Sequence, residues 1–294
     1  MAACSAKCFG LVITCIVCFV LVSLPIAVDF FLGVWEPRRQ GFFCGDESIS
    51  LPYASDTVSN EALWGLKLGG AVLVALAEGY ITKVKASLNF KVLKVVLRRG
   101  LKRSAIFVNS LVCAGMLLFI QMAEMSAVDV MKLSMGNLRP HFLAVCKVNA
   151  SFTCTPGIYV TDDVCTGDAD VIKEARKSFP SGHSGTAGCL AAYVALYLQY
   201  RVRNKSWVLP RLVVQVGLVF GCLYIMGSRV ADHKHHLADV IGGAVIGAAF
   251  GAVGMWVTKD LTKTTGKRGA RQDTDRRFSA GQESVNEQSA MSRM

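Results

Sequence analysis

Three histidines and two carboxylates lie immediately before a long apolar run near the end of the sequence. Residues 228–239 read Ser-Arg-Val-Ala-Asp-His-Lys-His-His-Leu-Ala-Asp. On a helix, His235 and Asp239 would lie one turn apart, and His236 would reach Asp239 almost as well. A carboxylate that holds one imidazole nitrogen leaves the other nitrogen free to act as nucleophile or base. The spacing therefore predicts a reactive histidine without choosing between the two, and the same cluster could alternatively bind zinc.

Further groups suited to binding an anion adjoin other apolar runs. Arg229 can fork onto a phosphate or carboxylate, and Lys132 is followed at a distance by Arg139. In the run Pro-Ser-Gly-His, Ser181 can cap a helix, and Gly182 lets backbone amides approach an anion closely. Taken singly, each group also fits an interfacial basic pair or an ordinary helix start.

The composition places these groups in a membrane protein. The chain has 294 residues, of which 52% are hydrophobic, and its net charge is +11. Its mean hydropathy is +0.41, and its apolar residues form long blocks typical of membrane helices. The basic residues lie mostly between these blocks, as expected for loops that face anionic lipid, so we expect a bilayer as partner and no nucleic acid.

The apolar blocks predict an all-α, polytopic protein with six transmembrane helices. Residues 1–258 would form this membrane domain, and the polar residues 259–294 a disordered cytosolic tail. The predicted spans cover residues 9–31, 62–81, 106–128, 185–198, 212–227 and 237–257.

The loop between the second and third spans fixes the orientation. It carries many lysines and arginines and no acid, which indicates the cytosolic side. Both termini are then cytosolic, and the segments after span three, before span four and between spans five and six share the opposite side. These segments contain all 5 histidines of the chain, together with Lys132, Arg139 and Arg229. The sequence thus predicts an active site at the extracellular or lumenal interface.

Covalent modifications are predicted on the same side. The sequon Asn149-Ala-Ser151 lies in an extracytoplasmic loop, so we expect a glycan on Asn149. Disulfides are expected in an oxidising compartment, and four loop cysteines allow three pairings. These cysteines are Cys44, Cys146, Cys154 and Cys165.

Together, the three groups resemble the three-part signature of the type 2 phosphatidic acid phosphatase superfamily. The matching runs are Lys132-x6-Arg139-Pro140, Pro180-Ser181-Gly182-His183 and Ser228-Arg229-x5-His235-x3-Asp239. The six spans, the Phe43-Cys44-x-Asp46-Glu47-Ser48 loop and the run Arg139-Pro140-His141-Phe142 are similar to its animal lipid phosphate phosphatase branch.

The resemblance implies a role for each signature residue. His235 would attack phosphorus, with Asp239 orienting it, and His183 would protonate the leaving group and then activate water. The phosphoryl oxygens would be held by Lys132, Arg139, Ser181, Gly182 and Arg229. The roles of His141, His233, His236 and Glu78 stay open.

The resemblance also implies a substrate class. Phosphatidic acid, lysophosphatidic acid, sphingosine 1-phosphate or ceramide 1-phosphate would be hydrolysed without a metal or cofactor. We expect the protein in the plasma membrane, with an internal membrane as the alternative. A homo-oligomer is compatible with the sequence. Two other functions compete: a phosphotransferase that passes the phosphoryl group to an alcohol, and a lipid-phosphate transporter or receptor without enzymatic activity.

Overall fold

The computed structural model describes residue 20 and residues 36–88, 97–161 and 163–262. Helices account for most of these residues. The helices are α2 (Asn60–Leu88), α3 (Leu97–Met135), α4 (Phe142–Cys146), α5 (Ala169–Ala175), α6 (Gly182–Arg201), α7 (Val208–Ala231) and a further helix, Leu237–Thr262. Two short 3₁₀ turns cover Glu47–Ile49 and Lys205–Trp207, and the strands β1 (Phe42–Phe43) and β2 (Tyr159–Val160) pair antiparallel.

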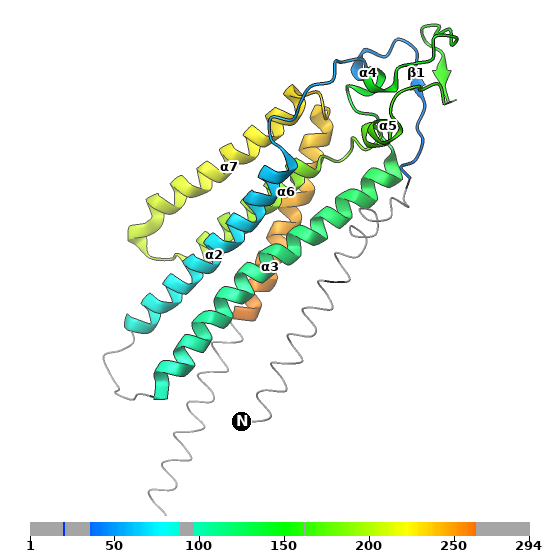
Figure 1. The fold of residues 1–294 in the computed structure, drawn as a ribbon. Coiled ribbons are helices and arrows are strands. Elements are labelled where there is room, and N and C mark those ends of the chain that lie inside the picture. The colour runs from blue at the N-terminus through cyan, green and yellow to red at the C-terminus, as the bar shows by residue number, and fades with distance from the viewer. Residues whose placement is uncertain (1–19, 21–35, 89–96, 162, 263–294) are drawn as a thin grey trace, which may run out of the picture. The chain divides into compact units, whose positions relative to one another are not determined.

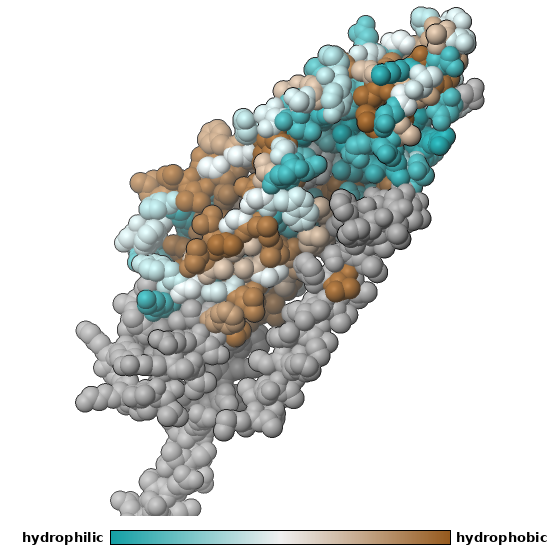
Figure 2. All heavy atoms as spheres, viewed as in Figure 1, coloured by the Kyte–Doolittle hydropathy of each residue, from teal (hydrophilic) through white to brown (hydrophobic). Residues whose placement is uncertain are grey.

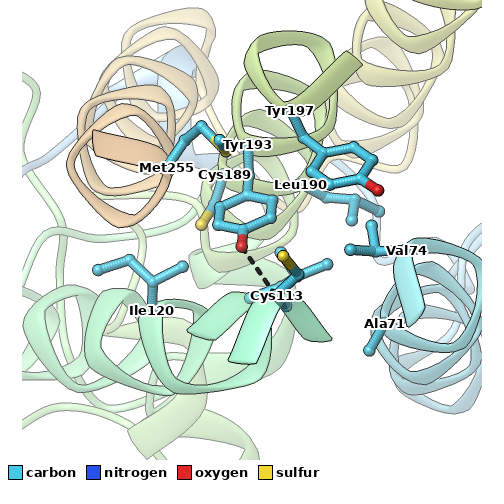
Figure 3. Packing of buried hydrophobic residues seen from close by; sticks show 10 residues of the cluster. Ala71, Val74, Cys113, Ile120, Cys189, Leu190, Tyr193, Tyr197 and Met255 are labelled. Carbon is cyan, nitrogen blue, oxygen red and sulfur yellow. Dashed lines mark hydrogen bonds between the residues drawn. The ribbon is translucent and has the colours of Figure 1, made fainter. Parts of the chain in front are cut away.

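The long helices lie along one another (Figure 1). α3 packs against α2 and α6, and α6 packs against α7. Their shared interior is apolar, and Figure 3 shows side chains of α2, α3 and α6 meeting there. The Tyr193 hydroxyl, buried among them, donates a 2.7 Å hydrogen bond to the Cys113 carbonyl oxygen. This satisfies the polar end of a side chain that otherwise contributes apolar area.

Four helices in the described part of the chain are long and apolar enough to cross a membrane. They are Asn60–Lys83, Phe107–Met135, Lys205–Ala231 and Leu237–Thr262. Hydrophobic residues cover the visible face of the helices, and hydrophilic residues gather towards α4 and α5 (Figure 2). These helices confirm the prediction of a largely helical membrane protein.

The six predicted spans are not all tested. Of the first, residues 9–31, only residue 20 is among the described residues, so this span is not tested. The fourth, residues 185–198, lies within α6, which is not among the four apolar helices although its 20 residues extend about 30 Å. The reason is its position: α6 is largely buried among other helices and is rich in small and polar residues. A helix enclosed by protein needs no lipid-facing apolar surface.

A stripe of glycines brings the Leu237–Thr262 helix against α6. A Cβ atom added at Gly247 would stand 1.8 Å from the Gly185 carbonyl oxygen, and one at Gly251 would stand 2.4 Å from the Cys189 carbonyl oxygen. One turn nearer the start of the helix, a Cβ at Gly243 would stand 2.3 Å from the Ser181 carbonyl oxygen. Small residues four apart let two membrane helices approach at backbone distance. This contact fixes the start of α6 beside the start of the Leu237–Thr262 helix.

Residues 36–59, 136–161, 163–181 and 232–236 form what we call the polar end. It has its own apolar cluster, which includes Phe42, Phe142 and Val160. Disulfides join Cys44 to Cys154 and Cys146 to Cys165, so the structure selects one of the three pairings that the sequence allowed. Asn149 is exposed here, and its backbone N–H donates to the Val164 carbonyl oxygen.

Glu78, whose role the sequence left open, pairs inside the helix bundle. Its carboxylate is fully buried and accepts a 2.7 Å hydrogen bond from Arg201 Nε and a 3.0 Å hydrogen bond from the Tyr197 hydroxyl. A buried charge needs such partners. We therefore interpret Glu78 as structural.

The boundary predicted for the tail is too early. Residues 259–262 continue the Leu237–Thr262 helix instead of starting a disordered segment. No glycine or proline separates them from Thr258, so the backbone hydrogen-bond pattern of the helix continues. The rest of the predicted tail, residues 263–294, lies outside the described residues.

Candidate active site

The end of α7 positions Arg229 and His235. α7 stops at Ala231, and His233 takes the left-handed conformation (φ 55°) that ends many helices. The turn brings the backbone N–H groups of Lys234 and His235 back to the Arg229 carbonyl oxygen, at 3.0 and 3.3 Å. The five residues between Arg229 and His235 are therefore a helix stop and a turn that place both side chains on one cavity.

The end of α3 positions Lys132 and Arg139 in a similar way. Lys132 lies in the last turn, and Gly136 ends the helix with φ 65°. A Cβ atom at Gly136 would stand 1.9 Å from the Arg38 carbonyl oxygen, so only glycine fits this turn. Beyond it, the Arg139 N–H donates a 2.8 Å hydrogen bond to the Ala175 carbonyl oxygen.

The start of α6 carries the third group. α6 begins at Gly182, and the side chain of Ser181 caps it by accepting from the Ser184 N–H, as the sequence predicted. The Ser181 N–H donates a 3.0 Å hydrogen bond to the Asp239 carbonyl oxygen. A Cβ atom at Gly182 would stand 3.4 Å from Lys132 Nζ, so the ammonium lies against the glycine. The absence of a side chain leaves room for that ammonium beside the helix start.

Asp239 is held by groups that do not face the cavity. Its Oδ2 accepts a 2.6 Å hydrogen bond from Ser178 Oγ and a 2.8 Å hydrogen bond from the His236 N–H. The second bond caps the start of the Leu237–Thr262 helix. The same oxygen lies 3.7 Å from His235 Nδ1 and 3.4 Å from His236 Nδ1. His235 and Asp239 are therefore adjacent, as expected, but their separation is too long for a hydrogen bond. His235 Nδ1 is buried and has no hydrogen-bond partner among the described residues.

Six of the eight predicted site residues meet at one cavity of about 400 Å³. Ser181 and Asp239 are buried behind its wall, and Asn149 and the four disulfide cysteines are absent from its lining. All lining residues belong to the compact unit Met1–Met255. They are Tyr53, Asp56, Asn60, Lys132, Arg139, His141, Asp170, Val171, Glu174, Ala175, Gly182, His183, Arg229, Lys234 and His235.

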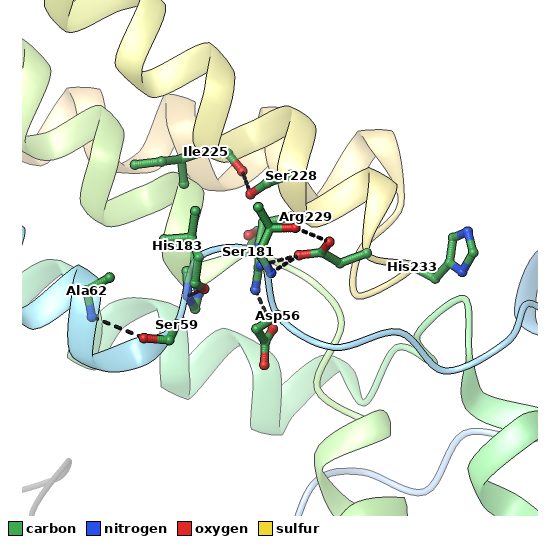
Figure 4. A network of polar contacts seen from close by, with 12 residues as sticks. Asp56, Ser59, Ala62, Ser181, His183, Ile225, Ser228, Arg229 and His233 are labelled. Carbon is green, nitrogen blue, oxygen red and sulfur yellow. Dashed lines mark hydrogen bonds and ion pairs between the residues drawn. The ribbon is translucent and has the colours of Figure 1, made fainter.

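Both arginines of the cavity pair with carboxylates. Arg229 Nη1 lies 2.7 Å from Asp56 Oδ1, as Figure 4 shows. Arg229 Nη2 contacts Asp232. Arg139 Nη2 contacts Glu174. The Nε atoms of both arginines are nevertheless buried and have no hydrogen-bond partner within the described part of the chain. Three cationic residues, Lys132, Arg139 and Arg229, line this one cavity, which favours an anion as its ligand.

The cavity keeps two of its lining histidines, His183 and His235, uncharged. Burial lowers the pKa of His235 to about 3, assisted by the nearby Arg139 and Lys132 cations, although Asp239 opposes the shift. Burial also lowers the pKa of His183 to about 4, together with Arg229 and Lys132. His236 differs: its contact with Asp239 raises its pKa, and its side chain is partly exposed. The nucleophilic form of a histidine is the neutral one, which His235 provides.

Sequence reasoning missed several residues of this site. Asp56 and Val58 come from the segment before α2, and Val58 accepts a 3.2 Å hydrogen bond at its carbonyl oxygen from His183 Nε2. Tyr53 was also missed, and its ring packs edge-on against His141. His141, whose role the sequence left open, contacts the His233 carbonyl oxygen through Nδ1 at 2.7 Å. The one signal in the sequence was the excess of acids in the first loop, which would face a cationic site.

The zinc alternative has no support in the geometry. Within residues 36–88, 97–161 and 163–262, no three side chains of the His, Cys, Asp and Glu types are grouped to hold a metal ion. His235 and His236 contact the same Asp239 oxygen, but His236 Nε2 lies 3.2 Å from the Ser48 carbonyl oxygen, outside the cavity lining.

Comparison with known proteins agrees with the three motifs. The profile of the PAP2 superfamily matches residues 106–263, which include every cavity residue of the three motifs. The chain belongs to the PAP2 superfamily. The resemblance inferred from the sequence is thereby confirmed.

Relatives of the chain share most of its length. It is 34% identical to mouse phospholipid phosphatase 1 over 262 residues, covering 88% of each protein. It is 36% identical to rat phospholipid phosphatase 1 over 257 residues, covering 85% of each. It is 35% identical to human phospholipid phosphatase 2 over 256 residues, covering 84% of this chain and 82% of the human protein. No solved structure matches the chain.

Proposed function

We propose that this chain, a lipid phosphate phosphatase by its family and its relatives, hydrolyses phosphate monoesters through a phosphohistidine at His235. The observation that carries the proposal is that Arg139, Arg229 and Lys132 line the same cavity as His235 and His183. Two arginine forks and a lysine can bind a phosphoryl group and offset the charge that develops on it.

The first step is attack by His235 Nε2 on phosphorus, with its other nitrogen turned towards Asp239. The bond between phosphorus and the alcohol oxygen breaks, and His183 gives the leaving oxygen a proton. Asp239 orients the imidazole and stabilises its positive charge as the nitrogen–phosphorus bond forms. Water then attacks the phosphohistidine, His183 takes its proton, and inorganic phosphate leaves.

The proton on His183 requires the substrate. In the empty cavity the surrounding Arg229 and Lys132 cations help to keep this histidine neutral. A phosphate monoester carries between one and two negative charges at neutral pH, so its binding offsets those cations and raises the pKa of His183. Binding thus prepares the acid that the first step needs.

The polar end would face the extracellular or lumenal side, with both termini in the cytosol and six helices crossing the bilayer. Its two disulfides support this orientation, because disulfides persist in oxidising compartments. The exposed side chain of Asn149 supports a glycan there. A site at the helix ends suits a substrate whose acyl chain stays in the bilayer, such as phosphatidic acid, lysophosphatidic acid, sphingosine 1-phosphate or ceramide 1-phosphate, and the plasma membrane is the location we expect.

The test measures phosphate release in detergent micelles with excess chelator. We expect His235→Ala to lose about a thousandfold or more of the activity and His236→Ala to stay within about tenfold of the wild type. Equal losses would overturn the assignment of the nucleophile. Substrate consumption with little free phosphate would favour a phosphotransferase, and binding without turnover would favour a transporter or receptor.

A further inference from the structure

The segment before α2 occupies two functional groups of the cavity. Asp56 holds the Arg229 guanidinium at 2.7 Å, and two residues later the Val58 carbonyl oxygen lies 3.2 Å from His183 Nε2. Figure 4 shows this segment passing beside Arg229 and His183. The phosphate-binding arginine and the proposed acid are therefore both engaged by one short stretch of chain.

Asp56 lies on the open side of Arg229. The Arg229 side chain is 2% exposed, whereas the Asp56 side chain is 45% exposed, and both line the cavity. On its other side, Arg229 contacts Asp232, which is itself held by the Thr57 N–H and hydroxyl at 2.8 and 2.6 Å. An anion that enters the cavity must therefore take the place of the Asp56 carboxylate in order to contact Arg229 Nη1.

We propose that Asp56 sets the affinity of the site, because its carboxylate competes with the substrate phosphate for Arg229. A phosphate monoester brings up to about two negative charges and several acceptor oxygens, so it can displace a single, half-exposed carboxylate. Weaker anions do not gain enough from the site to displace it. After hydrolysis, the returning carboxylate competes with the product phosphate and promotes its release.

The Thr57 contacts make this displacement local. The Thr57 backbone N–H and hydroxyl remain tied to Asp232 while the Asp56 side chain turns away. The exchange therefore needs a change of side-chain rotamer rather than an opening of the whole segment. Such a change is fast compared with the motion of a loop.

The inference rests on the proposed phosphate site, and its test uses a matched control. Asp170 lines the same cavity and is exposed, and no contact of its carboxylate with Arg229 is present. Asp56→Asn and Asp170→Asn therefore remove the same charge from one cavity, but only Asp56→Asn removes the competitor.

The experiment measures the Kd of inorganic phosphate for the full-length protein in detergent, together with turnover of a short-chain phosphatidic acid. We expect Asp56→Asn to tighten phosphate binding about tenfold, the order of one charged hydrogen bond, and to lower KM in parallel. Asp170→Asn should change either value less than about twofold.

Equal shifts in both variants, or weaker phosphate binding by Asp56→Asn, would overturn the role of Asp56. Phosphate binding does not require turnover, so the Kd comparison decides this inference even for a protein that releases no phosphate. A wild type that binds phosphate but never hydrolyses the lipid would instead overturn the proposed function.

Discussion

Ser178 Oγ donates a 2.6 Å hydrogen bond to Asp239 Oδ2, and both residues are buried. The backbone of Ser178 is fixed as well, because its N–H donates a 2.9 Å hydrogen bond to the Asn137 carbonyl oxygen. Ser178 precedes the Pro-Ser-Gly-His run, and Asp239 closes the third motif. The hydroxyl therefore joins two motifs behind the cavity and fixes the carboxylate that faces His235.

Replacing Ser178 by alanine should lower kcat about tenfold to a hundredfold and leave KM nearly unchanged. The substitution removes one hydrogen bond to a charged group, worth about 1.5 to 3 kcal/mol, from a residue that orients His235 without touching substrate. Ser184→Ala is the control, since this buried hydroxyl contacts Ser181 Oγ at 3.1 Å and not Asp239. Similar losses in both variants, or a loss confined to KM, would contradict a positioning role.

Acid should destabilise the protein partly through His235. Its pKa is lowered from 6.5 to about 3 on folding, so the unfolded chain binds more protons in that window. Stability therefore falls as the pH drops below about 6.5, by at most about 1.4 kcal/mol per pH unit for this group. We expect the Tm of His235→Asn in detergent to fall less between about pH 7 and about pH 5 than that of the wild type.

His236 should act in the opposite direction. Asp239 raises its pKa, so its contribution to stability is present at low pH and is lost as the pH rises through the folded-state value. We expect His236→Gln to lower Tm at about pH 5 and to have little effect at about pH 8. His235→Asn and His236→Gln should therefore change the pH dependence of Tm in opposite directions. If both variants changed it in the same direction, the environments assigned to the two histidines would be wrong.

The glycine contact between α6 and the Leu237–Thr262 helix should be sensitive to one methyl group. Gly247→Ala would place a Cβ 1.8 Å from the Gly185 carbonyl oxygen, so the helices must separate. We expect a cost of about 1 to 3 kcal/mol, seen as a lower Tm in detergent. Gly221→Ala is the control: nothing lies within 4 Å of a Cβ there, and alanine favours a helix. A Gly247→Ala protein as stable as Gly221→Ala would contradict the packing.

Glycosylation tests the orientation. The sequons at Asn149 and Asn204 lie at opposite ends of the bundle, because Asn149 is in the polar end and Asn204 follows the far end of α6. We expect Asn149→Gln to abolish the mobility shift caused by glycosidase and Asn204→Gln to leave it intact. A glycan on Asn204 alone would place the cavity in the cytosol.

The sequence predicted the convergence of the motifs because each lies at the end of an apolar run. Parity of the spans put Lys132, His183 and His235 on one side, and the structure brings them to one cavity. The ends of the helices then bring the motif residues face to face. Gly136 and His233, both with positive φ, turn the chain after α3 and α7.

The residues that escaped prediction share a different property. Asp56 and Ser178 contact partners distant in the chain, Arg229 and Asp239, and neither follows a helical period or a motif. The predicted pairing of His235 with Asp239 was also incomplete. The Asp239 oxygen that faces His235 also accepts hydrogen bonds from the Ser178 hydroxyl and the His236 N–H. Such choices among competing partners depend on packing in three dimensions, which spacing does not encode.

Trapping the phosphoenzyme tests the central claim most directly. The full-length protein would be mixed with lipid substrate carrying labelled phosphate and quenched in alkali during turnover, because phosphohistidine survives in alkali. Mass analysis of the peptide that contains residues 228–239 should find the phosphoryl group on His235. Label on His236, or active wild-type enzyme from which no labelled peptide can be trapped, would contradict the account.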